Sequence, residues 1–400
     1  MKRDLEFFCQ TFHPDTISTS QLFTDLLVRL AEAGRTITVY CGYPAKNAQD
    51  LPKDEVYRGV RIRRLGLAVP LKKSLFHRLA SYLSYLGGSF AAMMRLHKDA
   101  LVFGSTNPPF LLNLLWLASL LKGFDYQYLL ADIYPEGLDR VGLLSRKSLA
   151  YRLWSWFNAK GYARARTLVV LGRDMIPLLT ETYGQPLDKI VYIPHWSPHA
   201  GAAPQDFADN PMAKELGLSD AFVVQYSGNM GLWHDIDGLV ETARLLRDET
   251  SIRFVFIGDG MRRAGAVELA KRHNLANVIW LDYQPRERLG VSLTCCHAAL
   301  ISLRDGCEGV AVPCKLYGIM ASGRAILAQV PAASEVALAV GEAGCGLITP
   351  PGDPAALARA VLALARDRAG TRDMGRRAVE EYNRKYTLDQ GVAHFSRLFA

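Results

Sequence analysis

The chain has 400 residues, which is enough for two domains of a little under two hundred residues each. Half of the residues are hydrophobic and 22% are charged, so the composition supports packed cores and excludes a disordered or collagen-like protein. The formal net charge of +8 is uneven: residues 1–190 hold 25 Lys and Arg against 16 Asp and Glu, whereas residues 191–400 are close to neutral.

No run of eighteen apolar residues occurs, and the amino-terminal residues mix both charges, so we expect neither a membrane span nor a secretory leader. The seven cysteines are odd in number and scattered, without zinc-finger spacing. Their pattern indicates reduced thiols of a cytoplasmic protein.

Strand-like and helix-like segments alternate through the first half. A strand is predicted over Leu5–Phe12, a helix over Gln21–Ala33 and a second strand over Thr36–Cys41. Later strands of this half are predicted over Leu101–Phe103, Thr167–Leu171 and Lys189–Ile193. Such alternation predicts a parallel sheet with helices on both faces.

A cationic stretch without acidic residues lies between Glu55 and Asp99. Within it, apolar residues from Leu75 to Phe90 recur every three or four positions, which predicts an amphipathic helix. We interpret the stretch as a contact with an anionic membrane surface. A core-facing helix with a solvated basic face remains the alternative, and no nucleic-acid-binding motif accompanies the charge. The cations assigned to membrane contact are Arg61, Arg63, Arg64, Lys72, Lys73 and Arg78.

Residues 194–211 contain four prolines and no clear period, which predicts a linker between residues 1–193 and a second domain over residues 212–385. In the second domain we predict helices over Gly238–Asp248, Met261–His273, Lys315–Ala321, Ala355–Asp367 and Thr371–Lys385. The strands are predicted over Phe222–Tyr226, Arg253–Ile257, Val278–Leu281, Ala298–Ser302, Ala325–Gln329 and Gly346–Ile348. Two doubly wound α/β domains bind ligands at the carboxyl ends of their strands.

Two glycine-rich loops follow predicted strands of the second domain. Gly228, Asn229 and Gly231 form the first loop, where glycines let a backbone approach a ligand and the next helix favours an anion. An ordinary tight turn explains this loop equally well. Gly258, Asp259 and Gly260 form the second loop, in which the acid either binds hydroxyl groups or caps the next helix.

Lys315 lies in the first turn of a predicted helix, where the helix dipole disfavours a cation. A phosphate bound at this position would offset that cost, and a simple exposed lysine is the alternative. Neither a G-x-G-x-x-G fingerprint nor a P-loop is present, which argues against a hydride-transfer enzyme or a P-loop NTPase.

These motifs resemble the donor domain of family 4 glycosyltransferases over residues 189–385. The resemblance is carried by Tyr226 to Gly231, Ile257 to Met261, Pro313 to Leu316, Met320 to Ala325 and Pro351 to Leu357. In the first half, Phe12 to Pro14, Asn107 to Pro109 and Asp132 to Glu136 resemble the branch that builds bacterial exopolysaccharides and O-antigens on polyprenyl lipids.

The resemblance implies the GT-B fold, with two Rossmann-like domains that face a cleft. It implies a nucleotide-diphosphate sugar donor, retention of anomeric configuration, and no metal or other cofactor. It places acceptor contacts in the first domain, at His13, Asn107 and Glu136. It also places Arg173, Glu308 and Leu316 in the donor site, and it predicts that residues 386–400 pack back on the first domain.

The sequence departs from the family pattern at several positions. The paired glutamates of the family would fall on Val310 and Gly318, and Glu308 is the nearest acid to the first of them. The Arg/Lys pair that follows the first glycine loop is replaced by residues 232–235, where His234, if protonated, supplies part of the positive charge.

We therefore expect a hexosyl- or N-acetylhexosaminyltransferase on the inner face of a bacterial inner membrane, acting on a lipid-linked glycan. Front-face transfer would use Lys315 and His234 for the departing phosphates and Asp132 for the acceptor hydroxyl. The alternative is a non-catalytic relative that binds a lipid-linked glycan or a partner transferase.

Overall fold

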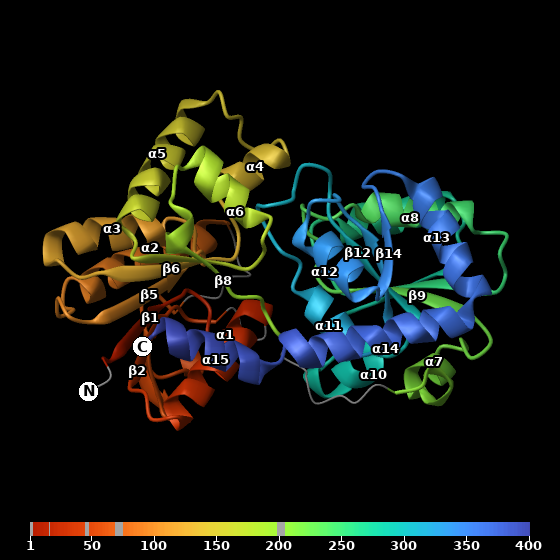
Figure 1. Cartoon of the computed structure of the whole chain (residues 1–400), viewed down its shortest axis with the longest axis horizontal. Coiled ribbons are helices and arrows are strands. Elements are labelled where there is room, and N and C mark those ends of the chain that lie inside the picture. The colour runs from red at the N-terminus through yellow and green to blue at the C-terminus, as the bar shows by residue number, and fades with distance from the viewer. Residues whose placement is uncertain (1–2, 16, 45–47, 69–74, 198–204) are drawn as a thin grey trace. The chain divides into compact units, whose positions relative to one another are not determined.

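A computed structural model describes residues 3–15, 17–44, 48–68, 75–197 and 205–400 (Figure 1). The chain divides into two α/β units. Unit 1 consists of residues 1–198, 309–311 and 388–400, and unit 2 consists of residues 199–308 and 312–387. The first unit thus includes the carboxyl-terminal segment and a three-residue excursion from the second.

Unit 1 is built on an eight-stranded sheet in the order β3-β4-β2-β1-β5-β6-β7-β8, in which only β3 is antiparallel to its neighbour. Its strands are β1 (Leu5–Phe8), β2 (Ile37–Cys41), β3 (Asp54–Tyr57), β4 (Val60–Arg64), β5 (Leu101–Ser105), β6 (Tyr126–Leu130), β7 (Thr167–Val170) and β8 (Ile190–Tyr192). Its helices are α1 (Ser18–Glu32), α2 (Leu75–Met93), α3 (Leu111–Lys122), α4 (Glu136–Arg140), α5 (Leu149–Arg164), α6 (Met175–Pro177) and α15 (Leu388–Leu398).

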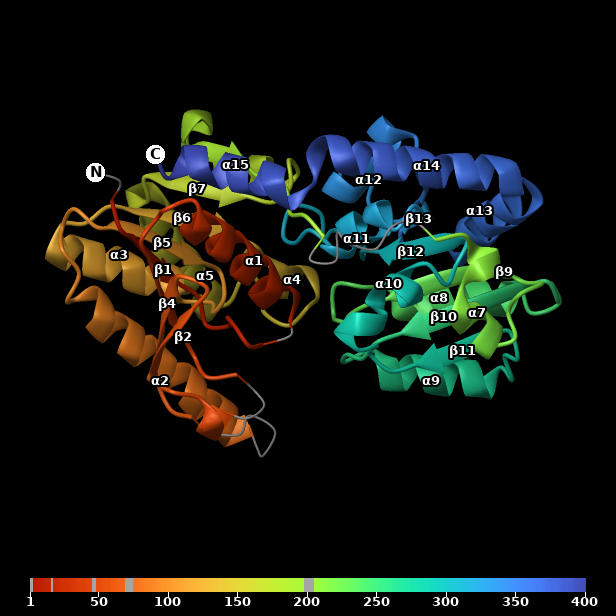
Figure 2. The same cartoon turned by 90° about the horizontal axis from the view of Figure 1, so that it is seen from below.

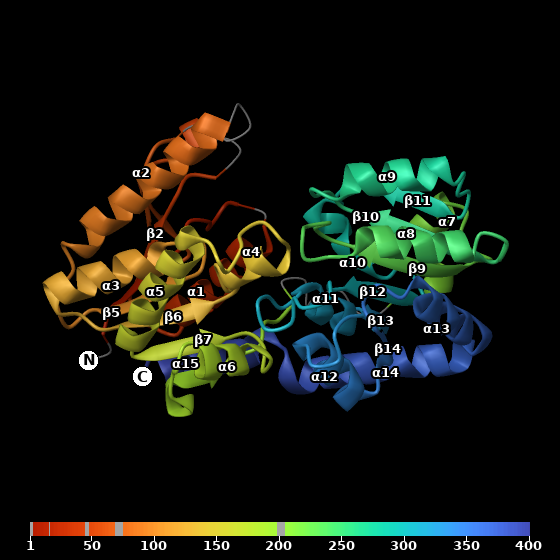
Figure 3. The same ribbon diagram turned by 90° about the horizontal axis from the view of Figure 1, so that it is seen from above.

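The helices of unit 1 lie on both sides of its sheet. Helix α3 packs against both α2 and α5, and the three form one layer (Figure 3). Helices α1 and α15 lie side by side away from that layer (Figure 2). The sheet core combines aliphatic and aromatic side chains; Phe7, for example, stacks on Phe103 with ring centroids 5.3 Å apart.

Helix α15 brings the end of the chain onto unit 1. Asp389 pairs with Arg29 of α1 at 2.6 Å, and the carbonyl of Phe399 accepts a hydrogen bond from Arg35 at 2.8 Å. Gly391 faces the buried indole of Trp196, because a Cβ at this glycine would lie 2.5 Å from the ring. The close approach of this helix therefore requires a glycine.

Unit 2 is built on a six-stranded parallel sheet in the order β11-β10-β9-β12-β13-β14. Its strands are β9 (Phe222–Ser227), β10 (Ile252–Ile257), β11 (Val278–Leu281), β12 (Ala298–Ser302), β13 (Ala325–Gln329) and β14 (Gly346–Thr349). Its helices are α7 (Pro211–Glu215), α8 (Ile236–Leu245), α9 (Arg263–Arg272), α10 (Leu289–Leu293), α11 (Lys315–Ala321), α12 (Glu335–Ala343), α13 (Pro354–Arg366) and α14 (Arg368–Lys385).

The order of these strands creates a switch point in unit 2. From β9 the chain moves outward through β10 and β11, then returns to the other side of β9 with β12. The crossovers on the two sides of β9 therefore lead in opposite directions, which leaves room for a ligand at the carboxyl ends of β9 and β12. The fold itself thus marks the place where a binding site is expected.

The sequence patterns miss some elements of unit 1. The hairpin of β3 and β4 lies at the start of the cationic stretch and was not predicted, and neither was β6. Strand β4 alternates buried and exposed residues, so Arg61 and Arg63 point outward while Arg64 is buried. Of the predicted linker, residues 198–204 lie outside the described residues, but Phe207 and Asn210 are buried parts of unit 2.

In the part of the chain that the structure describes, no helix is both long enough and apolar enough to cross a bilayer. All seven cysteines are free thiols.

Candidate functional site

Two glycine loops of unit 2 pack directly against each other at the carboxyl ends of β9 and β10. The amide of Gly228 donates to the carbonyl of Ile257 at 2.9 Å, and the amide of Met230 donates to the carbonyl of Asp259 at 2.8 Å. The amide of Gly228 is therefore engaged within the protein and is not free to bind a phosphate.

Gly258 and Gly260 are required by this loop-to-loop contact. Their φ angles are +128° and +147°, which side chains rarely tolerate. A Cβ at Gly258 would lie 2.2 Å from the carbonyl oxygen of Gly228, and one at Gly260 would lie 2.6 Å from the carbonyl oxygen of Met230. Both glycines, predicted as donor-binding residues, thus hold the first loop in place.

Lys315 connects helix α11 to the end of β9. Its Nζ donates to the hydroxyl of Tyr226 at 2.5 Å and lies 3.7 Å from the centroid of the same ring. The Tyr226 hydroxyl in turn donates to the carbonyl of Asn229 at 2.7 Å. A Cβ at Gly228 would be 3.7 Å from Nζ, so the amine lies beside the glycine loop. The sequence predicted Lys315 and the loop but missed Tyr226, although a buried tyrosine at a strand end needs a hydroxyl partner.

The environment of this amine lowers its proton affinity. Burial against Tyr226 lowers the pKa of Lys315 from 10.5 to about 7. An anion bound next to the amine would favour the charged form and raise the pKa again. The Lys315 amine is therefore protonated to a greater extent when an anionic group is bound beside it than when the site is free.

His234 does not supply the positive charge expected of it. Burial, followed by repulsion from Lys315, lowers the pKa of His234 to about 3. Its Nδ1 lies 2.5 Å from the carbonyl of Ser302, which only accepts, so the neutral ring carries its proton on Nδ1. His234 instead joins the segment after β9 to the end of β12, as does the amide of Asp235, which donates to the Ser302 hydroxyl at 2.9 Å.

The remaining predicted donor residues differ in their surroundings. Asp259 is exposed, and its carboxylate accepts the amide of Gly260 at 2.8 Å rather than capping α9, whose N-cap is Arg262. Leu316 is fully buried and its amide donates to the carbonyl of Pro313, so the donor contact predicted for it is wrong. The side chain of Asn229 folds over Gly231, where a Cβ would lie 2.9 Å from Nδ2.

In unit 1, three predicted residues follow neighbouring strands. His13 lies after β1, Asn107 after β5 and Asp132 after β6, and these strands are adjacent in the sheet. The Nδ2 of Asn107 donates to the hydroxyl of Thr11 at 2.8 Å, while the ring of His13 stacks on Tyr57 at 3.7 Å. Mainly because of burial, the pKa of His13 is lowered, so this ring is neutral at pH 7.

Asp132 adds a carboxyl group to this edge. Burial raises its pKa from 3.8 to about 6, which leaves a carboxylate of raised basicity at neutral pH. Its backbone pairs with Ala311 in an isolated bridge, and the amide of Ile133 donates to the carbonyl of Val310 at 2.8 Å. Val310, which stands in the family's first glutamate position, thus contributes its backbone carbonyl to a hydrogen bond within unit 1.

Glu136 was predicted to contact the acceptor, and this prediction is wrong because its side chain is fully buried. Its Oε1 accepts hydroxyl hydrogen bonds from Tyr151 at 3.2 Å, Ser155 at 3.1 Å and Tyr183 at 2.5 Å. Glu136 therefore ties α4 to α5 and to Tyr183, which follows the π-helix Leu178–Thr182.

An aromatic group that the sequence analysis missed lies near Asp132. Trp154 of α5 stacks on Phe110 at 4.3 Å and on Tyr134 at 6.0 Å between ring centroids. These three residues line a small pocket of unit 1 at the carboxyl ends of β5 and β6.

Two further predicted donor residues lie in different units. Arg173 follows β7 in unit 1, with its guanidinium 5.9 Å from the ring centroid of Tyr192. Glu308 is the last residue before the excursion into unit 1, and its Oε2 is buried with no hydrogen-bond partner among the described residues.

The cations predicted to contact a membrane do not form one exposed cluster. Arg64 is 1% exposed and pairs with Glu55 at 2.6 Å, and Arg63 pairs with Asp54 of the neighbouring strand. Lys72 and Lys73 lie outside the described residues, as does the side chain of Arg78. The assignment of Arg64 to membrane contact is therefore wrong, because its guanidinium is buried and paired with Glu55 inside unit 1.

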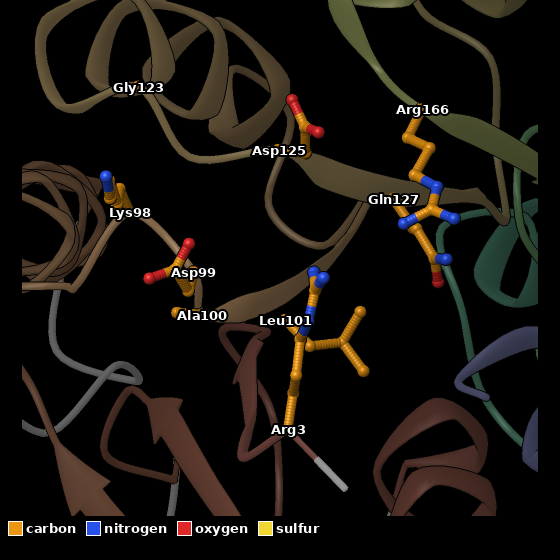
Figure 4. Close-up of a pocket in the computed structure, with 9 residues that line it drawn as sticks. All are labelled: Arg3, Lys98, Asp99, Ala100, Leu101, Gly123, Asp125, Gln127 and Arg166. Carbon is orange, nitrogen blue, oxygen red and sulfur yellow. The ribbon is translucent and has the colours of Figure 1, made fainter. Parts of the chain in front are cut away.

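A cavity of unit 1 with a volume of 270 Å³ lies at the opposite edge of the sheet (Figure 4). Arg3, Gln127 and Arg166 line it at the amino ends of the strands, and none of the predicted site residues does. Among the described residues, no group of three or more His, Cys, Asp or Glu side chains is placed to hold a metal ion.

Two family models match the chain. Residues 221–367 match the model described as glycosyl transferases group 1, and residues 20–196 match the model of the glycosyl transferase 4-like domain. Together the two models cover most of both units.

Curated relatives agree with these matches. The chain is 32% identical over 271 residues to a probable glycosyltransferase, WbjE, of Pseudomonas aeruginosa, covering 67% of this chain and 66% of that one. It is 25% identical over 266 residues to WcaI of Escherichia coli K12, a putative colanic acid biosynthesis glycosyl transferase, with 65% of each chain covered. The match therefore spans about two thirds of the length of each relative.

Solved structures share the fold over almost the whole chain. Sucrose-phosphate synthase from Thermosynechococcus elongatus superposes with a TM-score of 0.78 at 17% identity, covering 99% of this chain and 98% of that one. HepE of Anabaena, solved in complex with UDP-glucose, superposes with a TM-score of 0.73 at 13% identity and 99% coverage of both chains.

Proposed function

Because the chain belongs to the family 4 group of GT-B glycosyltransferases, we propose that it moves a sugar from a nucleotide-diphosphate donor to a lipid-linked glycan. The product would be a unit of a bacterial surface polysaccharide, in line with the naming of the WcaI relative. The proposed donor sugar is a hexose or an N-acetylhexosamine.

The observation that carries this proposal is the amine of Lys315, held on the ring of Tyr226 beside the Gly228 loop. It lies at the switch point of unit 2, where doubly wound folds bind nucleotides. A diphosphate at this place would pair with the amine and take it to its charged form. Positive charge aimed at a leaving diphosphate stabilises the transition state, in which negative charge grows on that group.

We propose that Asp132 orients the acceptor hydroxyl in unit 1. A carboxylate with a pKa near 6 is ionised at neutral pH and accepts a hydrogen bond from the hydroxyl. In the proposed front-face reaction the acceptor oxygen bonds to the anomeric carbon as the bond to the diphosphate breaks. The acceptor attacks from the face that the diphosphate leaves, so the anomeric configuration is retained, and the hydroxyl proton passes to the departing diphosphate.

The proposed reaction uses no metal or other cofactor. Lys315 supplies the positive charge that a divalent ion provides in other sugar transferases. Transfer should therefore persist in EDTA, and a loss of activity that Mg²⁺ or Mn²⁺ restores would contradict this part of the proposal.

The test is a thermal-shift panel of the purified chain with UDP-, GDP- and ADP-sugars, because a ligand that binds only the folded state raises its stability. One nucleotide family should raise the melting temperature, and Lys315→Ala should reduce that shift. Lys214→Ala is the matched control, since Lys214 is exposed on α7. A well-folded chain that no nucleotide sugar stabilises would overturn the proposed donor site.

One observation favours a second candidate function, binding without catalysis. Val310 and Gly318 replace the family's glutamate pair, and Val310 is buried with its carbonyl bonded to Ile133. A non-catalytic relative would still bind a lipid-linked glycan or a partner transferase. Donor binding without transfer or donor hydrolysis, under conditions in which the acceptor is bound, would establish this alternative.

A further inference from the structure

The outward positions of three neighbouring helices in unit 1 are apolar. On α5 the exposed residues Leu149, Leu153 and Trp156 follow one another at spacings of four and three, which places them on one stripe. Leu149 is 78% exposed and Trp156 is 51% exposed. A surface helix of a soluble protein normally carries polar side chains at such positions.

The two adjacent helices repeat this pattern. Leu117, Leu120 and Leu121 are the exposed residues of α3, and Leu79 and Leu83 lie one turn apart on α2. The stripes are joined, because Trp116 of α3 lies 6.5 Å from Trp156 between ring centroids. Helix α2 is held to the start of α3 by the Tyr82 hydroxyl, which donates to the carbonyl of Pro109 at 3.2 Å. We call these eight exposed side chains the leucine face; the helices that carry them form one layer (Figure 3).

The long helix α14 of unit 2 provides an internal comparison. Its exposed positions are occupied by arginine, glutamate and asparagine, with Ala369 as the single exception. The leucine face therefore differs in composition from the exposed side of α14.

The charge of the same layer has one sign. Helices α2, α3 and α5 contain no Asp or Glu. Arg152 and Lys160 are exposed among the leucines of α5, and the Lys160 amine lies 5.6 Å from the ring centroid of Trp156. Lysine and arginine at such positions extend toward lipid headgroups while their stems lie on apolar surface, and tryptophan favours the same interface.

We propose that the leucine face docks unit 1 on an anionic lipid bilayer. The leucines and Trp156 insert into the headgroup region, and Arg152 and Lys160 pair with lipid phosphates. This surface replaces the predicted cluster around Arg64, whose charge is neutralised inside unit 1. Docking on the bilayer rests on the proposed function in one respect: its purpose would be to deliver a lipid-linked acceptor to the end of β6. Trp154 of α5 stacks on Phe110, the residue before α3, and on Tyr134, which follows β6, so this aromatic group connects the layer to the end of β6.

The experiment is flotation of the full chain with vesicles of phosphatidylcholine alone or mixed with phosphatidylglycerol. The chain should bind the anionic vesicles, and the pair Leu120→Glu and Leu149→Glu should weaken this binding at least tenfold. Both side chains are more than half exposed, so the pair should fold, which an unchanged melting temperature verifies. The matched control is Val56→Glu on β3, an equally exposed apolar residue of the same unit outside the leucine face.

The charges form a second arm. Arg152→Gln with Lys160→Gln should weaken binding to the anionic vesicles and leave the weak binding to neutral vesicles unchanged. The control pair, Arg372→Gln with Arg376→Gln on α14, should leave binding to both the anionic and the neutral vesicles unchanged. Equal binding by all variants, or no vesicle binding by the parent chain, would overturn the proposal.

One other occupant of the leucine face has a distinct signature. A second copy of the chain on the leucine face would show as a concentration-dependent dimer that Leu120→Glu disrupts, and this result would overturn the lipid assignment. Failure of the proposed transferase function can be distinguished from failure of the membrane proposal. Nucleotide-sugar binding and transfer to a water-soluble acceptor do not need the leucine face. Vesicle binding that follows the predicted pattern supports the proposal whether or not transfer is detected.

Discussion

The amine of Lys315 lies on the face of the Tyr226 ring, 3.7 Å from its centroid, and donates to the hydroxyl of the same residue at 2.5 Å. The ring removes water from the amine without offering a full negative charge. The free site therefore holds a lysine close to the midpoint of its titration at neutral pH. An incoming diphosphate supplies the missing charge, so we expect binding to be coupled to proton uptake.

This coupling predicts a pH dependence of donor affinity. The pKa of Lys315 in the free chain is about 7, and a bound diphosphate raises it. Affinity for the donor should be nearly constant below pH 6.5 and should fall by up to about tenfold per pH unit above pH 7. Calorimetry from pH 6 to 8.5, in buffers of different ionisation enthalpy, measures both the affinity and the protons taken up.

The control for this prediction is Lys315→Met, which removes the titrating group. Its donor affinity should be roughly 10- to 100-fold lower at pH 6.5, the range expected for a lost hydrogen bond to a charged group. Its affinity should also be independent of pH. Proton uptake that survives in Lys315→Met would assign the coupling to another group.

Tyr226→Phe separates the hydroxyl from the ring. The variant leaves the Asn229 carbonyl and the Lys315 amine without their shared partner, which should lower stability by about 1–3 kcal/mol and weaken donor binding. The matched control is Tyr126→Phe, which removes a buried hydroxyl bonded to the carbonyl of Gly161 in unit 1. Urea unfolding should show a loss in both variants, whereas donor affinity should fall only in Tyr226→Phe.

Gly258→Ala tests the contact between the two glycine loops. The φ of +128° and a Cβ position 2.2 Å from the Gly228 carbonyl predict destabilisation by roughly 2–5 kcal/mol, together with loss of donor binding. Gly265→Ala is the opposite case, because Gly265 is exposed in α9 and no atom lies within 4 Å of its added Cβ. The Gly265→Ala variant should gain roughly 0.5–1 kcal/mol in the free energy of unfolding. A melting temperature of Gly258→Ala equal to or above that of Gly265→Ala would refute the packing argument.

Asp132→Asn should lose transfer activity and gain stability at neutral pH. The folded-state pKa of Asp132 is about 6, above its ordinary 3.8, so the folded chain binds more protons than the unfolded chain between these values. Ionisation of Asp132 therefore costs stability as pH rises through this range, by at most about 3 kcal/mol. The stability difference between the Asp132→Asn variant and the parent chain should be full above pH 7 and should vanish near pH 3.5. A difference independent of pH would show that burial of the charge is not its cause.

Glu136→Gln and Glu136→Leu distinguish a positioning role from contact with the acceptor. The amide oxygen of Gln can still accept the hydroxyl hydrogen bonds of Tyr151, Ser155 and Tyr183, whereas Leu leaves them unpaired and should cost roughly 1–3 kcal/mol. We expect Glu136→Gln to keep the KM for the acceptor near that of the parent chain. A large rise in KM at unchanged stability would restore the acceptor role.

The sequence by itself determined the two α/β units, the strand ends that carry the Gly228 and Gly258 loops, and Lys315 at the start of α11. These features depend on apolar periodicity, glycine placement and helix-start chemistry, which are local along the chain. The same local patterns missed the hairpin of β3 and β4, because the alternation in these short strands lies within a run of charges. They also missed β6, a five-residue strand that is buried on both faces and therefore shows no alternation.

The tertiary structure alone decided the electrostatic state of each site residue. His234 is neutral because burial and Lys315 disfavour its charge, Glu136 is enclosed by three hydroxyls, and Arg64 is paired inside unit 1. Each outcome depends on residues distant in sequence, since burial and pairing are set by packing and not by spacing along the chain. The leucine face has the same origin: an amphipathic pattern shows which side of one helix is apolar, but only the packing of α2, α3 and α5 shows that these sides remain uncovered.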